Sequence, residues 1–460
     1  MLVLFCQSTM NFMRKRICFL VWLLACGCWI WGLPGSAQAE NWGHWRGPFF
    51  NGSTSEKNLP AKFSKTENVL WSADLPGPSA ATPIIWGNHV ILTAADKGNK
   101  SFWAIALDHA TGRILWQRQV GAGNLSHDSM SNYASPSPVT DGQVVVFFFG
   151  NGEMAAFDFQ GQKLWSRNIQ TDYGTFAFLY NFSSSPLIWG GKLYLQVLQR
   201  NVPVNGRGRR DGPNDSYLLA LEPQTGKELW RQIRPSEAVA ESCEAFTSPV
   251  IYTDKERTEL LIAGGDCITA HDPVTGKELW RWGTWNPNRI SHWRLVPSPV
   301  AGEGAVLVCA PKGGAVYAVK ADGNGNLNES ALAWKNQDRT VTSDVATPLY
   351  YKGRFYVLNS NQERKYVSCL EPATGKVIWT GELKSRVKIE ASPTGADDKI
   401  YAVNFKGDVF VIGTGDTFEL LGTAEMGADS DNQVRSSVSI AQGHLFVRTE
   451  SKLFCLSQKD

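Results

Sequence analysis

One ten-residue segment concentrates side chains that recognise ligands. It reads Trp285-Asn-Pro-Asn-Arg-Ile-Ser-His292-Trp293-Arg294 and directly precedes an apolar stretch. Flat aromatic rings and guanidinium groups together clamp peptides, sugars or planar cofactors by stacking and cation–π contacts. The alternative is a loop packed between two structural units. His292, Trp293 and Arg294 are therefore candidate binding residues.

Other aromatic and polar residues extend this candidate set. A second aromatic stretch includes Tyr173, Phe176, Phe178 and Tyr180, and ends at Asn181. The short basic run Arg207-Gly-Arg-Arg-Asp211 lies in a Gly- and Asn-rich insertion, 199–215, which is typical of a mobile surface loop; contact with an acidic partner is the alternative. The predicted ligand-binding or partner-binding residues are Tyr133, Tyr180, Asn181, Glu241, His292, Trp293, Arg294, Asp344, Glu390 and Arg435.

Scattered carboxylates offer a second kind of chemistry. Glu241, Glu244 and Asp266 fall in one part of the chain, and Asp344 and Glu390 follow later. They could bind Ca²⁺ through oxygen ligands, or act on a polysaccharide as a hydrolase or lyase would. However, no Asp/Asn run has metal-loop spacing, and no C-x-x-C-H, H-E-x-x-H, G-x-S-x-G or Walker motif occurs. We therefore predict neither catalytic residues nor a metal site.

A repeated motif must position these side chains. It reads Ala106-Leu-Asp108-His-Ala-Thr111-Gly112-Arg-Ile-Leu-Trp116 and recurs at residues 220–230, 270–280 and 369–379, with a shortened copy at 158–165 and a lengthened copy at 322–334. The Thr-Gly pair predicts a tight turn in which Gly takes a positive φ. The Trp is expected to fill the seam between neighbouring sheets. The predicted docking residues are Trp71, Trp116, Trp165, Trp230, Trp280, Trp334 and Trp379.

A second motif, Ser or Thr before Pro or Val, opens an apolar strand in each repeat. We call its first residue the head residue. Successive copies lie 45 to 63 residues apart, at Thr82, Ser137, Ser185, Ser248, Ser298, Thr347, Ser392 and Ser437. Eight heads predict an all-β, eight-bladed β-propeller of four-stranded antiparallel blades. The last repeat lacks a fourth strand, so residues 68–74, which carry Trp71, are expected to close the ring against the C-terminal strands. The seventh repeat has Leu421 where Trp is expected.

The topology also predicts where ligands meet the propeller. The Thr-Gly turns join the third and fourth strands, so the loops that lead to the next head lie on the opposite face. These loops are 127–132, 171–181, 235–245, 283–295 and 336–346, together with the insertion.

The motif A-x-D-x-x-T-G-x-x-x-W, complete at 106–116 and 270–280, resembles the tryptophan-docking motif of quinoprotein alcohol dehydrogenases and other PQQ-repeat propellers. The match covers roughly residues 66–460. The chain also resembles the propeller lipoprotein of the outer-membrane β-barrel assembly machine, which has this repeat and no quinone. Residues 41–48, 131–142 and 264–266 make it most similar to secreted PQQ-like propellers of planctomycetes. The dehydrogenase resemblance implies PQQ and Ca²⁺, but the adjacent Cys pair of those enzymes is missing here.

The N-terminus predicts export. Residues 1–39 combine a basic cluster at 14–16, an apolar run at 17–31 and an Ala37-Gln-Ala39 cleavage signal, so we expect a signal peptide that is cut before Glu40. An uncleaved anchor is the alternative. The expected mature chain has an N-terminal extension, 40–66, a propeller, 67–460, and no membrane span. Cys243 and Cys267 could form a disulfide in an oxidising compartment, whereas Cys309, Cys369 and Cys455 are predicted to be core residues.

These observations favour a binding or scaffold protein of the cell envelope over an enzyme. Removing residues 1–39 changes the formal net charge from +2 to −1, so neither nucleic acid nor an anionic membrane is an expected partner. The expected partner is an envelope protein or an extracellular polymer. The chain is expected to act as a monomer or in a hetero-complex. The expectation is no cofactor; the alternative function is a PQQ- and Ca²⁺-dependent dehydrogenase that oxidises alcohols or sugars.

Overall fold

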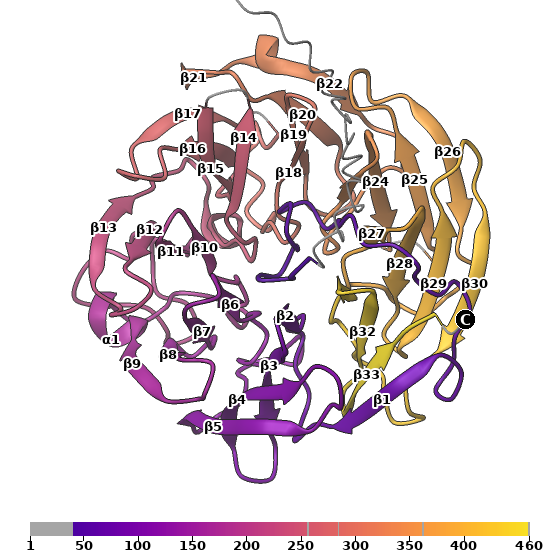
Figure 1. Ribbon diagram of the computed structural model, residues 1–460. Coiled ribbons are helices and arrows are strands. Elements are labelled where there is room, and N and C mark those ends of the chain that lie inside the picture. Colours follow the sequence, from indigo (N-terminus) through magenta and orange to yellow (C-terminus); the bar gives the residue numbers. More distant parts are fainter. Residues whose placement is uncertain (1–39, 255–256, 284, 361–362, 459–460) are drawn as a thin grey trace, which may run out of the picture. The chain divides into compact units, whose positions relative to one another are not determined.

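The computed structural model describes residues 40–254, 257–283, 285–360 and 363–458. In this part of the chain, eight antiparallel sheets stand as blades around a central axis (Figure 1). The strands follow the sequence order from the axis outward in seven blades, and in the last blade the N-terminal strand is outermost. The predicted eight-bladed all-β propeller is confirmed. It contains one short α-helix, α1 (Ile169–Tyr173), and two 3-10 helices, Ala240–Cys243 and Glu329–Ala331.

Each blade is built on four strands in the order predicted from the repeat, and blade 4 gains a short fifth strand. Blades 1 to 4 contain β2 (Ile84–Trp86), β3 (His89–Asp96), β4 (Ser101–Asp108) and β5 (Ile114–Ala122); β6 (Val139–Thr140), β7 (Val145–Phe148), β8 (Glu153–Phe157) and β9 (Lys163–Asn168); β10 (Leu187–Trp189), β11 (Lys192–Val197), β12 (Tyr217–Leu221) and β13 (Glu228–Ile233); and β14 (Val250–Asp254), β15 (Arg257–Gly264), β16 (Cys267–His271) and β17 (Glu278–Trp282).

Blades 5 to 8 complete the ring. They contain β18 (Val300–Gly302), β19 (Ala305–Cys309), β20 (Val316–Lys320) and β22 (Leu332–Asn336); β23 (Leu349–Tyr351), β24 (Arg354–Asn359), β25 (Tyr366–Leu370) and β26 (Val377–Glu382); β27 (Thr394–Ala396), β28 (Lys399–Val403), β29 (Asp408–Gly413) and β30 (Leu420–Glu425); and β31 (Ser439–Ala441), β32 (His444–Arg448), β33 (Lys452–Leu456) and β1 (Val69–Asp74).

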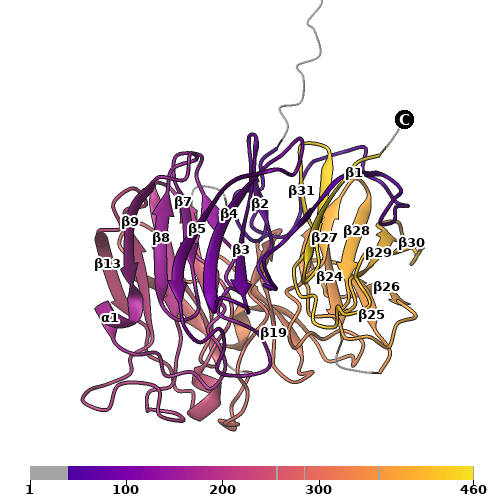
Figure 2. The ribbon, with the colours of Figure 1, turned by 90° about the horizontal axis from the view of Figure 1, so that it is seen from below.

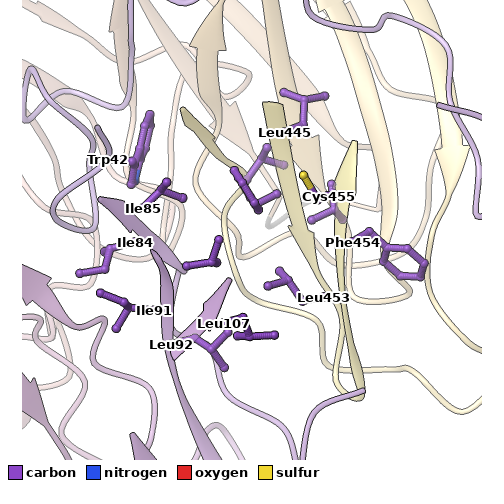
Figure 3. Close-up of a cluster of buried hydrophobic side chains, with 14 of the residues drawn as sticks. Trp42, Ile84, Ile85, Ile91, Leu92, Leu107, Leu445, Leu453, Phe454 and Cys455 are labelled. Carbon is purple, nitrogen blue, oxygen red and sulfur yellow. The ribbon is translucent and has the colours of Figure 1, made fainter. Parts of the chain in front are cut away.

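The ring closes by pairing the two ends of the propeller. β1 runs antiparallel to β33, with Trp71 opposite Cys455, so the predicted closing strand is confirmed and begins at Val69. Side chains from blades 1 and 8 share one buried cluster, which Trp42 joins beside Ile85 (Figure 3). The edges of β1 and β33 that face each other are therefore both paired.

Six of the seven docking Trp contact the Gly turn of the next blade. Trp116 lies over Gly161, where a Cβ atom would overlap its ring, and its Nε1 donates to the Phe159 carbonyl at 2.9 Å. The turn glycines have positive φ, as at Gly112 (70°). The same indole-to-carbonyl bond joins Trp71 to His109, Trp165 to Pro223, Trp334 to Pro372 and Trp379 to Gly415.

Blade 4 docks differently on blade 5. Trp280 is fully buried, and its Nε1 donates to Glu259 Oε1 within its own blade at 2.9 Å. Among the described residues of the lengthened turn of blade 5, no Gly lies against the ring of Trp280. Instead, the turn places β21 (Gly325–Asn326) parallel to β17, with Trp280 opposite Gly325 in the register. The long turn therefore holds the two blades together by adding a fifth strand to blade 4.

Blade 7 needs no docking Trp, and the prediction of Leu421 at that position was one residue off. In the register, Gly422 pairs with Val411 as Trp116 pairs with Ala106. Blade 8 has no third-to-fourth-strand turn for an indole to contact, because its fourth strand comes from the N-terminus. The N-terminal segment passes here instead: a Cβ on Gly422 would meet the Ala61 carbonyl, and Tyr401 donates to the Pro60 carbonyl.

The head residues form a ring of hydrogen bonds around the axis. The backbone N–H of each head donates to the head hydroxyl of the next blade, from Thr82 through Ser392, at 2.8 to 3.0 Å. Between blades 8 and 1 the bond differs, because Ser436 Oγ donates to the Ala81 carbonyl. The head hydroxyls thus satisfy buried backbone donors where the inner strands converge.

The N-terminal segment enters the axis from the face of the Thr-Gly turns. Trp42 exchanges both backbone hydrogen bonds with Ile85 in β2, and Thr54 donates to Gly395 in β27. Arg46 is buried and donates to the Pro348, Pro393 and Asn51 carbonyls. Figure 1 shows this indigo segment across the centre, and Figure 2 shows it along the upper edge. The first part of the predicted extension, up to about residue 54, is therefore packed against the inner strands of the propeller.

The five described cysteines are all buried and free. Cys309, Cys369 and Cys455 are core residues, as predicted. The disulfide considered for Cys243 and Cys267 does not form: Cys243 Sγ donates to the Ala238 carbonyl, and Cys267 accepts from Arg234.

The docking contact can be tested at two matched positions. Trp116→Phe keeps a ring over the Gly turn but loses the indole bond to Phe159, whereas Trp230 Nε1 has no partner among the described residues. Trp116→Phe should therefore lower the free energy of unfolding by about 1 kcal/mol more than Trp230→Phe. Urea unfolding of both variants measures this difference, and equal losses would contradict the role given to the indole N–H.

Candidate functional site

A pocket of about 170 Å³ lies on the axis and is lined from every blade. We call it the axial pocket. It borders the loops opposite the Thr-Gly turns, because Met130, Tyr180, Arg294 and Val345 all line it. The face predicted for ligand binding therefore carries the pocket. Trp45, from the N-terminal segment, is part of the lining and closes the side nearer the turns.

One position of the repeat supplies a complete ring of lining residues. The residue two places before each head lines the axial pocket in all eight blades: Ala80, Ser135, Ser183, Phe246, Val296, Val345, Glu390 and Arg435. The residue between it and the head is buried in each blade. The sequence analysis identified Glu390 and Arg435 but missed the other six. Aligning the eight heads and reading two places back would have found them all.

The ring is divided chemically. Phe246, Val296 and Val345, from consecutive blades, form an apolar arc, and the Tyr180 ring packs edge-on against Phe246 at 6.3 Å between centroids. Ser135 and Ser183 lie on blades 2 and 3, beside further hydroxyls of the head ring. The pocket can thus hold an apolar or aromatic group against one wall while the neighbouring wall, on blades 2 and 3, forms hydrogen bonds.

The ionic groups at the pocket are neutralised within the protein. Arg435 Nε contacts Glu390 Oε2 at 2.6 Å, and Lys388 contacts the other oxygen of Glu390. The Arg435 guanidinium also lies 4.5 Å from the Phe405 ring centre. Because two cations and a ring fix these side chains, Arg435 presents a pre-oriented donor surface.

A second ion-pair system supports the aromatic wall. Arg294 Nη1 contacts Glu241 Oε1 at 2.7 Å, and its guanidinium lies 4.7 Å from the centre of the Tyr180 ring. Behind it, the fully buried Glu244 pairs with Arg200 and accepts the Leu179 N–H at 3.0 Å. Burial raises the pKa of Glu244, although the bonds from Arg200 and Leu179 oppose the shift. Glu241 and Glu244 thus position Arg294 and Tyr180.

Asn181 also has a positioning role. It lines the pocket, but its side-chain oxygen accepts the His127 N–H at 3.0 Å, and its side-chain nitrogen donates to Ser126 Oγ and the Ser131 carbonyl at 2.9 Å. These bonds hold the loop 126–131 beside the head of blade 3. The amide therefore shapes the rim of the pocket.

The other predicted residues lie away from the axial pocket. Tyr133 hydroxyl bonds His127 Nδ1 at 2.8 Å, and Asp344 accepts the Lys312 N–H at 2.7 Å. His292 is exposed, and Trp293 packs partly against the core of blades 3 to 5. Of the segment 285–294, only Arg294 reaches the pocket. Its indole groups, at Trp285 and Trp293, pack against the core of neighbouring blades, which was the alternative considered.

The insertion 199–215 is held by specific contacts. Arg207 donates to the Phe178 and Leu179 carbonyls at 2.9 and 3.0 Å, and Arg200 reaches Glu244. Two of its basic residues thus brace the loop that carries Tyr180. The insertion was predicted to be a mobile surface loop, and its contacts through Arg200 and Arg207 differ from that prediction.

A second cavity continues from the pocket over blades 8 and 1. This lateral groove has a volume of about 300 Å³ and shares Ala80, Ser131, Ser135 and Arg435 with the axial pocket. Its remaining lining is mainly polar, with Lys97 and Thr449 among it. Its carboxylates are occupied by backbone donors: Asp128 accepts from Met130, and Glu450 accepts from Gln433. Together the two cavities can accommodate an extended ligand.

The residues present do not fit a quinone–calcium centre. Among the residues that the structure describes, no three His, Cys, Asp or Glu side chains approach closely enough to hold a metal ion. The five carboxylates considered for calcium are dispersed, with Glu241, Glu244 and Glu390 each paired to an arginine. Trp45 offers a flat surface, but of the described residues that line the pocket with it only Glu390 carries a carboxylate.

Asp266 is expected to make the stability of the fold depend on pH, which can be tested. Burial raises its pKa to about 6, against an opposing hydrogen bond from Asn286 at 2.8 Å. Because the folded state holds this proton more tightly, Asp266 stabilises the fold below about pH 4, and that contribution is lost as the pH rises through about 6. Its φ of 60° also suits Asn.

We expect Asp266→Asn to keep the bond to Asn286 and to remove this loss. Thermal unfolding between pH 4 and 7 should show the midpoint of the wild type falling relative to that of the variant. Parallel profiles would contradict the assigned protonation.

Comparison with known proteins places this geometry in a family. The family model described as "Outer membrane protein assembly factor BamB" matches residues 53–204 and 214–460. Comparison with curated protein sequences gives no significant match.

Solved structures share the fold at low identity. A europium-containing methanol dehydrogenase has a TM-score of 0.64 and 10% identity, covering 91% of this chain and 98% of its own. BamB from Moraxella catarrhalis has 0.54 and 14%, covering 84% and 99%. A quinohemoprotein alcohol dehydrogenase from Comamonas testosteroni has 0.61 and 12%, covering 91% and 81%. With the family model spanning most of its length, this chain belongs to the PQQ-repeat propeller family that is described by the outer membrane protein assembly factor BamB.

Proposed function

We propose that the protein is exported with residues 1–39 as its signal peptide, and that it serves as a non-catalytic binding protein of the cell envelope. Its ligand is a segment of another envelope protein, bound at the axial pocket and the lateral groove. One observation carries the proposal: the charged groups that line the pocket, Arg294, Glu390 and Arg435, are fixed by partners of opposite charge or by rings. Such groups recognise a ligand without reacting with it.

The chemistry of the two cavities supports a protein segment as the ligand. The apolar arc of Phe246, Val296 and Val345, faced by Trp45, suits an aliphatic or aromatic side chain. The lateral groove provides hydroxyl, amide and lysine groups for a polar chain that continues outward. A polysaccharide is the other extended ligand of this size, and the test below separates the two.

Two further points support the envelope. The family description names an outer membrane assembly factor, and the basic, apolar and Ala-x-Ala pattern of residues 1–39 is typical of a cleaved export signal. In the part of the chain that the structure describes, none of the helices has the length and apolar content that a membrane crossing requires.

Site-specific photo-crosslinking tests which face binds. A photoreactive residue at Met130, which is 38% exposed and lines the axial pocket, should crosslink to an envelope protein. The same residue at Val274, 61% exposed in a Thr-Gly turn on the opposite face, should give at least about fivefold less product. Adding Phe246→Ala should reduce the Met130 product about tenfold, because it removes the largest side chain of the apolar arc.

A matched control is Ile114→Ala, which removes an exposed side chain on the outer strand of blade 1 and should leave the product unchanged. Crosslinking only from Val274 would contradict the proposed face. Retention on an envelope polysaccharide without any crosslinked protein would contradict the class of ligand. Oxidation of an alcohol by the purified protein with added PQQ and Ca²⁺ would contradict the non-catalytic role.

A further inference from the structure

The carboxylate of Glu56 gathers backbone amides from three parts of the chain. Its Oε1 accepts the Glu40 N–H at 2.8 Å and the Gln442 N–H at 2.9 Å, and its Oε2 accepts the Gly443 N–H at 2.7 Å. Gln442 and Gly443 form the inner turn of blade 8. Glu56 therefore ties the chain at residue 40 directly to the last blade.

Residue 41 extends this connection to the first blade. The Asn41 side-chain oxygen accepts the Gly87 N–H at 2.9 Å, and Gln442 donates to the Gly87 carbonyl at 3.0 Å. Trp42, the next residue, pairs with Ile85 in β2 and is fully buried. Residues 40–42 thus bridge blades 8 and 1 at the closing seam of the propeller.

The local charges at this point are unbalanced. Among the described residues, neither Glu40 nor Glu56 has an ion-pair partner. The Glu40 carboxylate is held instead by Thr54 and by the Ser55 hydroxyl at 2.6 Å and N–H at 2.9 Å. Two partly buried carboxylates therefore lie close to the nitrogen of residue 40 without a counter-cation. Burial disfavours the charge on Glu40, but the hydrogen bonds from Ser55 and Thr54 outweigh it and hold the pKa of Glu40 below its usual value. A positive charge at residue 40 would add an ion pair to these bonds.

We propose that hydrolysis of the Ala39–Glu40 peptide bond supplies this charge, because the new α-ammonium group of Glu40 forms an ion pair with Glu56 that latches the N-terminal segment across blades 8 and 1. Water is consumed, Ala39 receives the new carboxylate, and the Glu40 nitrogen becomes an amine that is protonated near neutral pH. In the cell the cut is made by a peptidase of the signal-peptidase class.

The latch turns processing into a step of assembly. Before the cut, residue 40 offers Glu56 one neutral N–H; afterwards it offers a full charge at the same place. A charged donor strengthens such a hydrogen bond about twofold. The segment that leads to Trp42 and Trp45 is therefore held most firmly in the cleaved chain, and Trp45 closes the axial pocket. The inference rests on the proposed export only for the agent that makes the cut.

Two purified chains test the latch without reference to export. One begins at Glu40, released from a fusion protein that leaves no extra residue, and the other retains Gln38 and Ala39. Hydrogen exchange at the amides of Trp42, Gln442 and Gly443 reports local opening of the seam. We expect protection at these amides to be at least about fivefold higher in the chain that begins at Glu40, and unchanged elsewhere, as at Ile262 in blade 4.

Glu56→Gln in both chains removes the negative charge of the side chain together with one of its two acceptor oxygens. The advantage of the chain that begins at Glu40 should vanish in this background, which gives a coupling in a double-mutant cycle. Glu67→Gln is the matched control, since Glu67 lies in the same N-terminal part of the chain, has no ion-pair partner among the described residues and does not contact residue 40; it should preserve the fivefold difference. Raising the pH above about 9, where α-amino groups lose their proton, should reduce the advantage in thermal unfolding.

The outcomes decide between the parts of the proposal. Equal protection in the two chains, or an advantage that survives Glu56→Gln, would overturn the ion pair. N-terminal sequencing of the protein from envelope fractions should give Glu40. Another N-terminus there would overturn the assignment to the natural protein, even if the coupling were measured in the purified chains. Loss of crosslinking at Met130 would instead concern the proposed function and leave the latch untouched.

Discussion

Hydrogen bonds between neighbouring heads set the geometry of the axis. In each of seven steps a backbone N–H meets the hydroxyl of the next blade within 3.0 Å. A four-stranded sheet cannot bury both faces alone, so the blades must stack; the heads determine how closely they do so at the centre. Side chains alternate between two sides along an extended chain, so the residue two positions before a head lies on the same side as the head. Fixing the head therefore turns that residue toward the pocket. Ser183, Phe246 and Arg435 line the axial pocket for this reason.

The charged groups of the pocket are paired with one another or with neighbouring side chains. Glu390 and Arg435 come from consecutive blades and neutralise each other, and Arg294 is matched to Glu241. Bringing these groups together as pairs avoids the desolvation cost of an isolated ion. What remains available to a ligand is shape, ring surface and oriented N–H groups. The fold is shared with dehydrogenases, but the oxygen ligands that a metal needs are dispersed here.

Local regularity decided what the sequence could predict. The Thr-Gly turn and its Trp are short-range signals with a direct steric meaning, so the eight blades and the closing strand at Trp71 could be predicted. Contacts between distant loops could not: the segment 285–294 attracted attention by composition, yet only Arg294 reaches the pocket. Position relative to the head was the stronger signal, and it would have selected Phe246 over His292. The role of residues 59–63 beside Gly422 depends on a chain path of the N-terminus that no periodicity encodes.

The indole contact also gives the ring a direction. Except for Trp280, every docking Trp belongs to one blade and its receiving Gly to the following one, as with Trp165 and Gly226. Each internal repeat therefore contributes to two joints: its Trp to the joint with the following blade, and its turn Gly to the joint with the preceding blade. Duplication or loss of an internal repeat whose two joints both use this contact would leave every joint matched. Two junctions lack this property: between blades 4 and 5, β21 takes the place of the Gly contact, and between blades 7 and 8, residues near Ala61 stand in place of an indole. Blade number in such a propeller is consequently free to vary where the indole contact joins the blades but not at these two junctions.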